Sequence, residues 1–240
     1  MDGDRDGDGE MTVKGCMFDF SGTLFRIEPA ESWLRAVLAG AGLAAGDDEI
    51  AAYADRLERA GAQPGGAMPG NVPPALADLW RDGDLSARWH RAAYTGLSRA
   101  AGLPWDVHDA LYDRHSTPAA WQPYPDAAGV LGALRSRRVP VAVVSNIGWD
   151  LRPVFAAHGL DTFVDAFVLS YEQGVKKPDP RIFRTACDAL GLPPENTLMV
   201  GDDARADAGA AALGCPVLLV AHRPVADRPG ALRGVLDLIG

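Results

Sequence analysis

Apolar residues divide the chain into an early strand, a long helical stretch and a final part in which two kinds of pattern alternate. Residues 13–24 begin as an apolar run typical of a buried strand and then break into a Gly-Thr turn. Residues 29–120 show helical spacing and little strand pattern. From Pro125 onward, β-branched and aliphatic runs of strand length are separated by helical stretches. This alternation is typical of βαβ units and predicts a parallel sheet buried on both faces.

The sequence therefore predicts an α/β protein: a Rossmann-like parallel sheet flanked by helices, with an α-helical cap domain inserted after the first strand. We expect a core of residues 11–27 and 121–240, a cap of residues 28–120, and a disordered acidic tail of residues 1–10. The expected later strands are 139–145, 166–170, 197–201 and 216–220. The expected helices are 30–43, 48–60, 85–101 and 105–115 in the cap, and 180–190 and 204–213 in the core. The Gly- and Pro-rich residues 63–74 predict a surface loop.

Composition narrows the classes of partner. The net charge of −9 argues against a general binder of nucleic acid or anionic membranes, because either needs a positive face. No apolar run approaches the length of a membrane span, and the acidic start is the reverse of a signal peptide. The three cysteines stand far apart and lack the spacing of a disulfide framework or a metal site. We therefore expect a cytoplasmic protein, monomeric or homodimeric, that acts on a small molecule.

Three polar residues fall at the ends of predicted strands: Asp19, Ser145 and Asp202. In open α/β sheets ligands bind beyond the carboxyl ends of the strands, so we expect these residues to lie together. Lysine usage adds a fourth candidate. Only three of the 23 basic residues are lysines, and two of them, Lys176 and Lys177, are adjacent. A lysine pair in a chain that otherwise uses arginine indicates a specific role; we assign it to Lys177 and expect Lys176 to be solvated.

Four short motifs surround these residues. Asp19 begins Asp-Phe-Ser-Gly-Thr, and Ser145-Asn146 follows a Val-Ala-Val-Val strand. Lys177 begins Lys-Pro-Asp-Pro ahead of a predicted helix, and Asp202 lies in a Gly-Asp-Asp run. The four motifs resemble, in order and spacing, those of the haloacid dehalogenase-like hydrolases, whose first motif is Asp-x-Asp-Gly-Thr. They extend over residues 13–214, so the resemblance covers most of the chain.

The resemblance implies a mechanism and a metal. Asp19 would attack phosphorus and form a covalent intermediate, while Lys177 neutralises the nucleophile and the transferring group. Clustered carboxylates repel one another unless a cation lies between them, and oxygen ligands suit Mg²⁺. The implied Mg²⁺ ligands are Asp19, the backbone carbonyl of Ser21 and Asp202. The aspartates implied to act through water or from outside the inner ligand sphere are Asp203 and Asp207. The residues implied to bind phosphoryl oxygens are Gly22, Thr23, Ser145, Asn146 and Lys177.

Ser21 departs from the family pattern. The family's aspartate at this position protonates the leaving group and later activates water, and a serine hydroxyl is too weak an acid and base for either step. General acid–base catalysis typically contributes about 10²- to 10⁴-fold in rate. We therefore predict a slow enzyme, or one restricted to substrates with good leaving groups such as acyl phosphates. The remaining alternative is that another residue supplies the proton.

The function predicted on this basis is Mg²⁺-dependent hydrolysis of a small phosphorylated metabolite. A 2-haloacid dehalogenase is one alternative, because halide departs without an acid, although that reaction needs no metal and such enzymes resemble Asp-x-Tyr-Gly-Thr. A catalytically weak phosphate-binding regulatory module is another. A phosphonate hydrolase is disfavoured, because it would need a lysine in the cap and residues 28–120 contain none.

Two groups of residues near the cap are candidates for substrate contact. The tryptophans Trp33, Trp80, Trp89 and Trp105 are expected mainly to pack helices together, with one or two of them lining the pocket. Arg26 and Glu28 follow the Gly-Thr turn closely enough either to contact substrate or to form the hinge.

Overall fold

The computed structural model describes residues 12–239, so the predicted tail at residues 1–10 lies outside the described residues. A five-stranded, fully parallel sheet forms the centre of the core, in the order β5-β4-β1-β6-β7. Its strands are β1 Gly15–Phe18, β4 Val141–Ser145, β5 Ala166–Leu169, β6 Thr197–Gly201 and β7 Val217–Leu219. This arrangement confirms the predicted α/β class, with the first strand at the centre of a sheet built from the C-terminal half.

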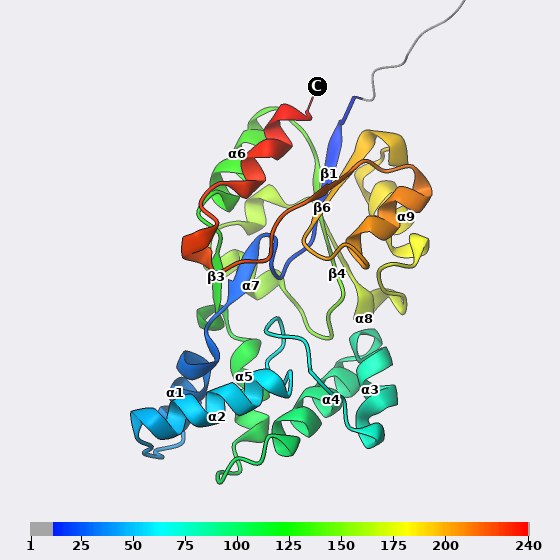
Figure 1. The fold of residues 1–240 in the computed structure, drawn as a ribbon. Helices are drawn as coiled ribbons and strands as arrows, with labels where there is room; N and C mark the ends of the chain where they lie inside the picture. Colours follow the sequence, from blue (N-terminus) through cyan, green and yellow to red (C-terminus); the bar gives the residue numbers. More distant parts are fainter. Residues whose placement is uncertain (1–11, 240) are drawn as a thin grey trace, which may run out of the picture.

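Side chains of the central strands alternate between the two faces of the sheet. Cys16 and Phe18 of β1 pack in the cluster that contains Val130 and Phe155, whereas Met17 packs in the cluster that contains Phe183. Both faces are therefore buried, as continuous apolar strand sequences require in a parallel sheet. Helices α6 (Ala127–Ser136), α7 (Arg152–Ala157) and α9 (Pro180–Leu190) cover the sheet, with α6 and α9 on opposite sides (Figure 1).

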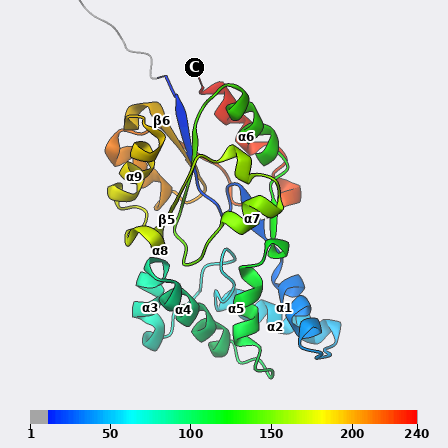
Figure 2. The same cartoon turned by 180° about the vertical axis from the view of Figure 1, so that it is seen from behind.

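Residues between β2 and β3 form a mainly helical layer at the end of the sheet, seen below it in Figure 1 and again from behind in Figure 2. Its α-helices are α1 Ala30–Gly40, α2 Asp47–Arg59, α3 Ala77–Asp82, α4 Ala87–Ala100 and α5 His108–His115. The layer has its own apolar cluster, in which Trp33 and Leu97 are fully buried. An amphipathic set of helices needs such a partner surface, because helix propensity alone does not hold short helices in water.

A two-stranded ribbon joins the layers. β2 (Phe25–Ile27) and β3 (Trp121–Pro123) pair antiparallel where the chain leaves the core and where it returns. Next to it, Arg114 donates two hydrogen bonds to the Glu28 carboxylate, at 2.7 and 3.0 Å. Glu28 is therefore held by an ion pair beside the ribbon in this structure.

Some predicted elements need correction. Helix α3 was not predicted, because its six residues follow a Pro-rich loop and offer too short a pattern. Residues 204–213 were predicted as an α-helix, but residues 207–213 wind as a 3-10 helix, η6 (Asp207–Leu213). Gly209 lies tightly against Pro178 there: an added Cβ would be 2.6 Å from the Pro178 carbonyl oxygen. The ribbon β2–β3 was also missed, since three-residue strands carry little signal.

The remaining elements are short. They are the α-helix α8 Ser170–Gln173 and the 3-10 helices η1 Pro74–Leu76, η2 Gly83–Leu85, η3 Pro118–Ala120, η4 Asp161–Phe163, η5 Pro194–Asn196, η7 Val225–Asp227 and η8 Ala231–Asp237. Among the described residues, no helix combines the length and the apolar character that crossing a membrane requires.

Phe155 joins the sheet to the ribbon, since its ring lies 5.0 Å from that of Phe25 and 5.1 Å from that of Phe167 (centroid distances), and it is fully buried. We expect Phe155→Ala to lower the free energy of unfolding by about 3–5 kcal/mol, through lost burial and the cavity left behind. The half-exposed Trp89 provides the control, because its ring is not enclosed by the core. Trp89→Ala should change the free energy of unfolding by less than about 0.5 kcal/mol. Urea denaturation of both variants checks this; equal losses would contradict the packing described.

Candidate active site

A buried ion-pair network lies at the carboxyl end of β1. The Lys177 Nζ donates to Asp19 Oδ1 at 2.7 Å and to Asp207 Oδ1 at 2.6 Å. All three residues are less than a tenth exposed. Asp19 directly follows β1, and its backbone N–H donates to the Val200 carbonyl of β6, so the sheet itself fixes its position. The structure therefore brings together three residues that the sequence places 158 and 30 positions apart.

The charges in this network are unbalanced. Burial raises the pKa of Asp19 above its ordinary range; Lys177 opposes the shift, while the Asp207 and Asp202 carboxylates add to it. Burial disfavours the charge on Lys177, but the carboxylates of Asp19 and Asp207 outweigh it and raise the pKa of this lysine. Lys177 therefore stays an ammonium group, and the carboxylates around it outnumber it.

The carboxylate cluster offers a donor set suited to a divalent cation. Asp19, Asp202 and Asp207 each present one oxygen, and these atoms lie within 4.8 Å of one another. Oxygen atoms of carboxylates are the ligands that Mg²⁺ prefers in proteins. Both oxygens of Asp207 already have partners within the protein. Oδ1 accepts from Lys177, and Oδ2 accepts from the Asp203 backbone N–H at 2.9 Å. The exposed Asp203 carboxylate in turn accepts from the N–H groups of two following residues, as a capping residue does.

The turn after Asp19 has room only for glycine at its centre. Gly22 has φ of +83°, and a Cβ there would lie 2.3 Å from Asp202 Oδ2. Thr23 Oγ1 donates to Asp202 Oδ1 at 3.4 Å. The predicted residues Gly22 and Thr23 therefore lie beside the Asp202 carboxylate in this structure.

Asn146 fixes the lysine rather than pointing freely into the site. Its side-chain Nδ2 donates to the Lys177 carbonyl at 2.9 Å, and its Oδ1 accepts from the Lys177 N–H at 2.7 Å. Both ends of the amide are thus engaged, and Asn146 also lines the cavity that contains Asp19. Ser145, its neighbour at the end of β4, is buried and lines the same cavity as Asp19.

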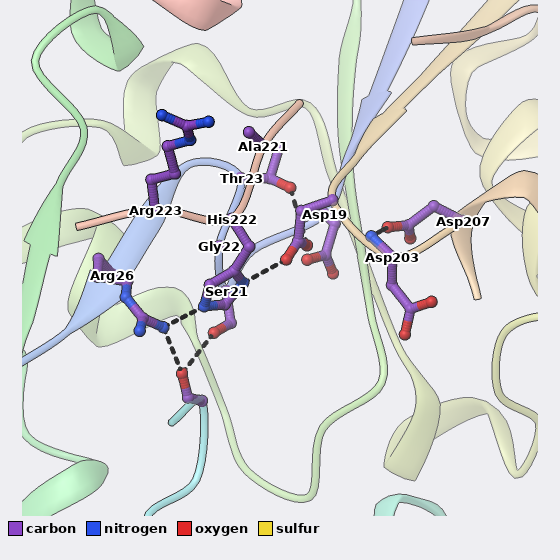
Figure 3. Close-up of polar contacts among 12 residues, drawn as sticks. Asp19, Ser21, Gly22, Thr23, Arg26, Asp203, Asp207, Ala221, His222 and Arg223 are labelled. Atoms are coloured by element: carbon purple, nitrogen blue, oxygen red, sulfur yellow. Dashed lines mark hydrogen bonds and ion pairs between the residues drawn. The ribbon is translucent and has the colours of Figure 1, made fainter. Parts of the chain in front are cut away.

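His222 enters the site from the segment after β7, as Figure 3 shows. Its Nδ1 lies 2.5 Å from Asp202 Oδ2, and its Nε2 contacts Arg26. With Nδ1–H donating to the carboxylate, Nε2 accepts from the guanidinium. The sequence alone does not indicate a role for His222, because a lone histidine outside every motif is not distinguishable from a surface residue. Arg26 was considered as a substrate contact, and here it holds His222.

Ser21 points toward the helical layer. Its Oγ donates to the Gly65 carbonyl at 3.5 Å, and Arg26 donates to the same oxygen at 3.1 Å (Figure 3). Gly65 belongs to the predicted Gly- and Pro-rich loop, and a Cβ on it would lie 2.9 Å from Ser21 Oγ. The loop therefore approaches the turn after Asp19 closely.

Arg228 clamps the same turn from the other side. This residue is 3% exposed; its guanidinium donates to the Gly22 carbonyl at 2.6 Å and also contacts the Thr23 carbonyl. It stacks on the Tyr124 ring at 3.2 Å from the centroid. Burial lowers the pKa of Arg228, and the Tyr124, Asp126 and Asp202 side chains oppose that shift. Arg228, like His222, thus supports the site from the C-terminal segment, and no sequence motif marks either residue.

A cavity of about 570 Å³ opens above these residues, lined by both the core and the helical layer. Lys176 was expected to be solvated; its side chain is 29% exposed, and its Nζ also donates to the Arg81 carbonyl and lies 3.7 Å from Asp84 Oδ2. Of the four tryptophans considered, Trp80 lines the cavity, whereas Trp33 is fully buried. The other two do not line it: Trp89 is 44% exposed, and Trp105 packs on Tyr53.

Known proteins share this fold and these motifs. A family model described as a haloacid dehalogenase-like hydrolase matches residues 13–214. The chain is 34% identical to haloacid dehalogenase-like hydrolase domain-containing protein 3 of Mus musculus, in a match that covers 58% of each chain. It is 30% identical to (S)-2-haloacid dehalogenase 4A of Burkholderia cepacia, covering 80% of this chain and 76% of that one.

Besides the dehalogenase, the relatives include a protein named as a phosphatase. A phosphoglycolate phosphatase of Shigella boydii serotype 4 is 27% identical, with 85% of this chain and 79% of the relative covered. Among solved structures, a dehalogenase with an intermediate complex superposes with a TM-score of 0.63 at 25% identity, covering 89% of this chain and 87% of the other.

The buried network yields a stability prediction. Lys177→Met removes the cation between Asp19 and Asp207 and leaves buried charge uncompensated, so we expect the free energy of unfolding to fall by about 3–5 kcal/mol. Lys14→Met, at an exposed lysine, is the control and should be close to neutral. Urea denaturation in the presence of a chelator checks both variants, and similar small changes in the two would show that the network is not held by Lys177.

Proposed function

The chain belongs to the haloacid dehalogenase-like hydrolases, and from this premise we propose that it is a Mg²⁺-dependent phosphatase of a small phosphorylated metabolite. The observation that carries the proposal is the cluster of Asp19, Asp202 and Asp207 around one buried lysine. Such a cluster suits a cation and the phosphoryl group that the cation neutralises. A 2-haloacid carries its own carboxylate, which three carboxylates without a metal would repel.

In the proposed reaction, a carboxylate oxygen of Asp19 attacks phosphorus. A new O–P bond forms as the bond to the leaving oxygen breaks, giving an aspartyl-phosphate and a leaving group released as a phenolate, carboxylate or alkoxide, which takes its proton from solvent. Water then attacks the same phosphorus and loses a proton to solvent, the O–P bond to Asp19 breaks, and inorganic phosphate leaves. Lys177, held by Asn146 and Asp207, keeps a positive charge beside the transferring group in both steps.

The metal site would be formed by Asp19, the backbone carbonyl of Ser21 and Asp202. When bound, Mg²⁺ supplies positive charge that offsets the phosphate anion. Both oxygens of the Asp202 carboxylate are held by neighbours: Oδ1 accepts from Thr23 and Oδ2 accepts from His222. Oriented carboxylates lose less freedom on binding a metal, and partners of metal ligands typically contribute about 10- to 100-fold in affinity.

We also propose that residues 28–120 act as a cap that excludes water and selects the substrate. Two contacts at opposite edges of the cavity support this role. Ser21 and Arg26 meet the Gly65 carbonyl on one side, and Ser170 Oγ donates to the Asp84 carbonyl at 2.6 Å on the other. Both edges of the helical layer are thus tied to segments that surround Asp19.

Dehalogenation is the second candidate, and the relative from Burkholderia cepacia is the observation that favours it. The two reactions share the nucleophile but differ in their need for metal and in the product released. A catalytically weak phosphate-binding module would bind phosphate and release none. These differences allow one set of assays to separate the three.

Phosphate release from p-nitrophenyl phosphate and acetyl phosphate tests the proposal. We expect hydrolysis with Mg²⁺, loss of it on adding a chelator and recovery on returning Mg²⁺, because the charge on phosphate then has no cation to offset it. Asp19→Asn should abolish release, since an amide cannot form the aspartyl-phosphate. Chloride release from 2-chloropropionate, with no phosphate release, would instead establish the dehalogenase; phosphate binding alone would establish the module.

Ser21 generates a prediction about leaving groups. The wild type should hydrolyse p-nitrophenyl phosphate much faster than an alkyl phosphate, because no acid protonates the alkoxide. Ser21→Asp should raise turnover of the alkyl ester by about 100-fold or more, the lower end of general acid catalysis, with a smaller effect on the p-nitrophenyl ester. Ser21→Asn has the same shape without the acid and is the matched control. An equal gain in both variants would locate the effect in the fit against Gly65 rather than in proton transfer.

A further inference from the structure

The cavity contains a pair of opposite charges away from the carboxylate cluster. Asp84 and Lys176 both line it, with side chains 26% and 29% exposed. Lys176 Nζ lies 3.7 Å from Asp84 Oδ2, and His90 Nε2 lies 3.9 Å from Oδ1, both beyond normal hydrogen-bond length. The two charges attract one another, yet the Asp84 carboxylate keeps its capacity to accept hydrogen bonds.

Neighbouring contacts fix this pair in place. The Asp84 carbonyl accepts from Ser170 Oγ at 2.6 Å, and Lys176 Nζ also donates to the Arg81 carbonyl. The pair thus presents one acceptor, the Asp84 carboxylate, beside one donor, the Lys176 ammonium group. A ligand group that carries an ammonium and a carboxylate on the same carbon matches such a pattern, because each charge meets its opposite.

Aromatic rings form much of the surrounding wall. Trp80 and Tyr94 lie 5.5 Å apart between ring centroids, and His90 and Tyr94 lie 4.6 Å apart; all three line the cavity. Trp121 and Trp149 line it as well, and the buried Trp149 Nε1 has no hydrogen-bond partner among the described residues. A flat apolar group next to this wall would gain burial and ring contacts.

The charge pair and Asp19 line the same cavity. Lys176 and Lys177 are adjacent in the chain, and the Lys177 ammonium group binds Asp19. A phosphorylated amino acid can therefore place its phosphate at Asp19 and its head group at Asp84 and Lys176.

Ser21 decides which amino acid phosphates suit the site. Without a leaving-group acid, an aryl ester reacts far more readily than an alkyl ester, because a phenolate leaves without help. We propose that the charge pair and the aromatic wall form a subsite for the head group of an aryl phosphate that carries an ammonium and a carboxylate, of the class of free O-phosphotyrosine. This inference rests on the proposed phosphatase function and specifies its substrate.

The test is a series of aryl phosphates that differ only in the head group, assayed on the wild type with Mg²⁺. The series is O-phosphotyrosine, tyramine phosphate, 3-(4-phosphooxyphenyl)propionate and phenyl phosphate. We expect kcat/KM to be about 100-fold higher for O-phosphotyrosine than for phenyl phosphate, with the two singly charged compounds between them, because each charge-assisted contact contributes about tenfold or more. O-Phosphoserine, an alkyl ester with the same head group, should be turned over slowly.

Two variants separate recognition from structure. Asp84→Asn should reduce the preference for O-phosphotyrosine over 3-(4-phosphooxyphenyl)propionate by about 10- to 100-fold. Lys176→Gln should instead reduce the preference for O-phosphotyrosine over tyramine phosphate. Asp78→Asn is the matched control, since Asp78 lies on the same helix α3 as Trp80 but does not line the cavity, and it should leave both preferences unchanged.

The outcomes distinguish the two levels of the proposal. Hydrolysis of phenyl phosphate at least as fast as that of O-phosphotyrosine would overturn the subsite and leave the phosphatase function standing. Equal losses on every substrate in Asp84→Asn and Lys176→Gln would show that the pair only holds the helical layer in place. Faster turnover of N-acetyl-O-phosphotyrosine amide than of the free amino acid would also overturn the inference, in favour of a peptide. Failure to hydrolyse any of these phosphates, and p-nitrophenyl phosphate and acetyl phosphate as well, would overturn the phosphatase function itself.

Discussion

The Nζ atom of Lys177 lies between two buried carboxylates, 2.7 Å from Asp19 and 2.6 Å from Asp207. Burial of three charged groups is tolerated only because each has a partner at hydrogen-bond distance. The arrangement also requires three separate strand ends to meet, since Asp19 follows β1, Asn146 follows β4 and fixes Lys177, and Asp207 comes after β6. The order of strands in the parallel sheet therefore brings these residues together.

Around this network, the C-terminal segment supplies the supports. Arg228 holds the carbonyls of Gly22 and Thr23, and His222 holds Asp202. The helical layer contributes the opposite wall, tied to the core at Ser21 on one edge and at Ser170 and Lys176 on the other. The proposed nucleophile, the proposed metal ligand Asp202 and the helical wall of the cavity thus come from three parts of the chain, each in contact with the turn or loops that follow a central strand.

Sequence patterns predicted the parts of this structure that depend on local chemistry. The strand at residues 197–201 and the helix at 180–190 were predicted with their observed bounds, because long apolar runs and a Pro-Asp-Pro start are strong signals. Asp19, Lys177 and Asp207 were found through motifs, and the resemblance implied that Lys177 neutralises Asp19, but the ion pair of Lys177 with Asp207 was not predicted. His222, Arg228 and the role of Lys176 could not be predicted, because each acts through a partner more than 15 residues away that no local pattern identifies.

The central claim is that Asp19 becomes covalently phosphorylated, and peptide mass spectrometry tests it most directly. The wild type would be mixed with p-nitrophenyl phosphate and Mg²⁺, quenched rapidly in acid and digested. The account predicts one added phosphoryl group on the peptide that contains Asp19, and none when the metal is chelated beforehand or when Asp19 is replaced by asparagine. A phosphoryl group on another residue, or phosphate release with no phosphorylated peptide at any time point, would contradict it.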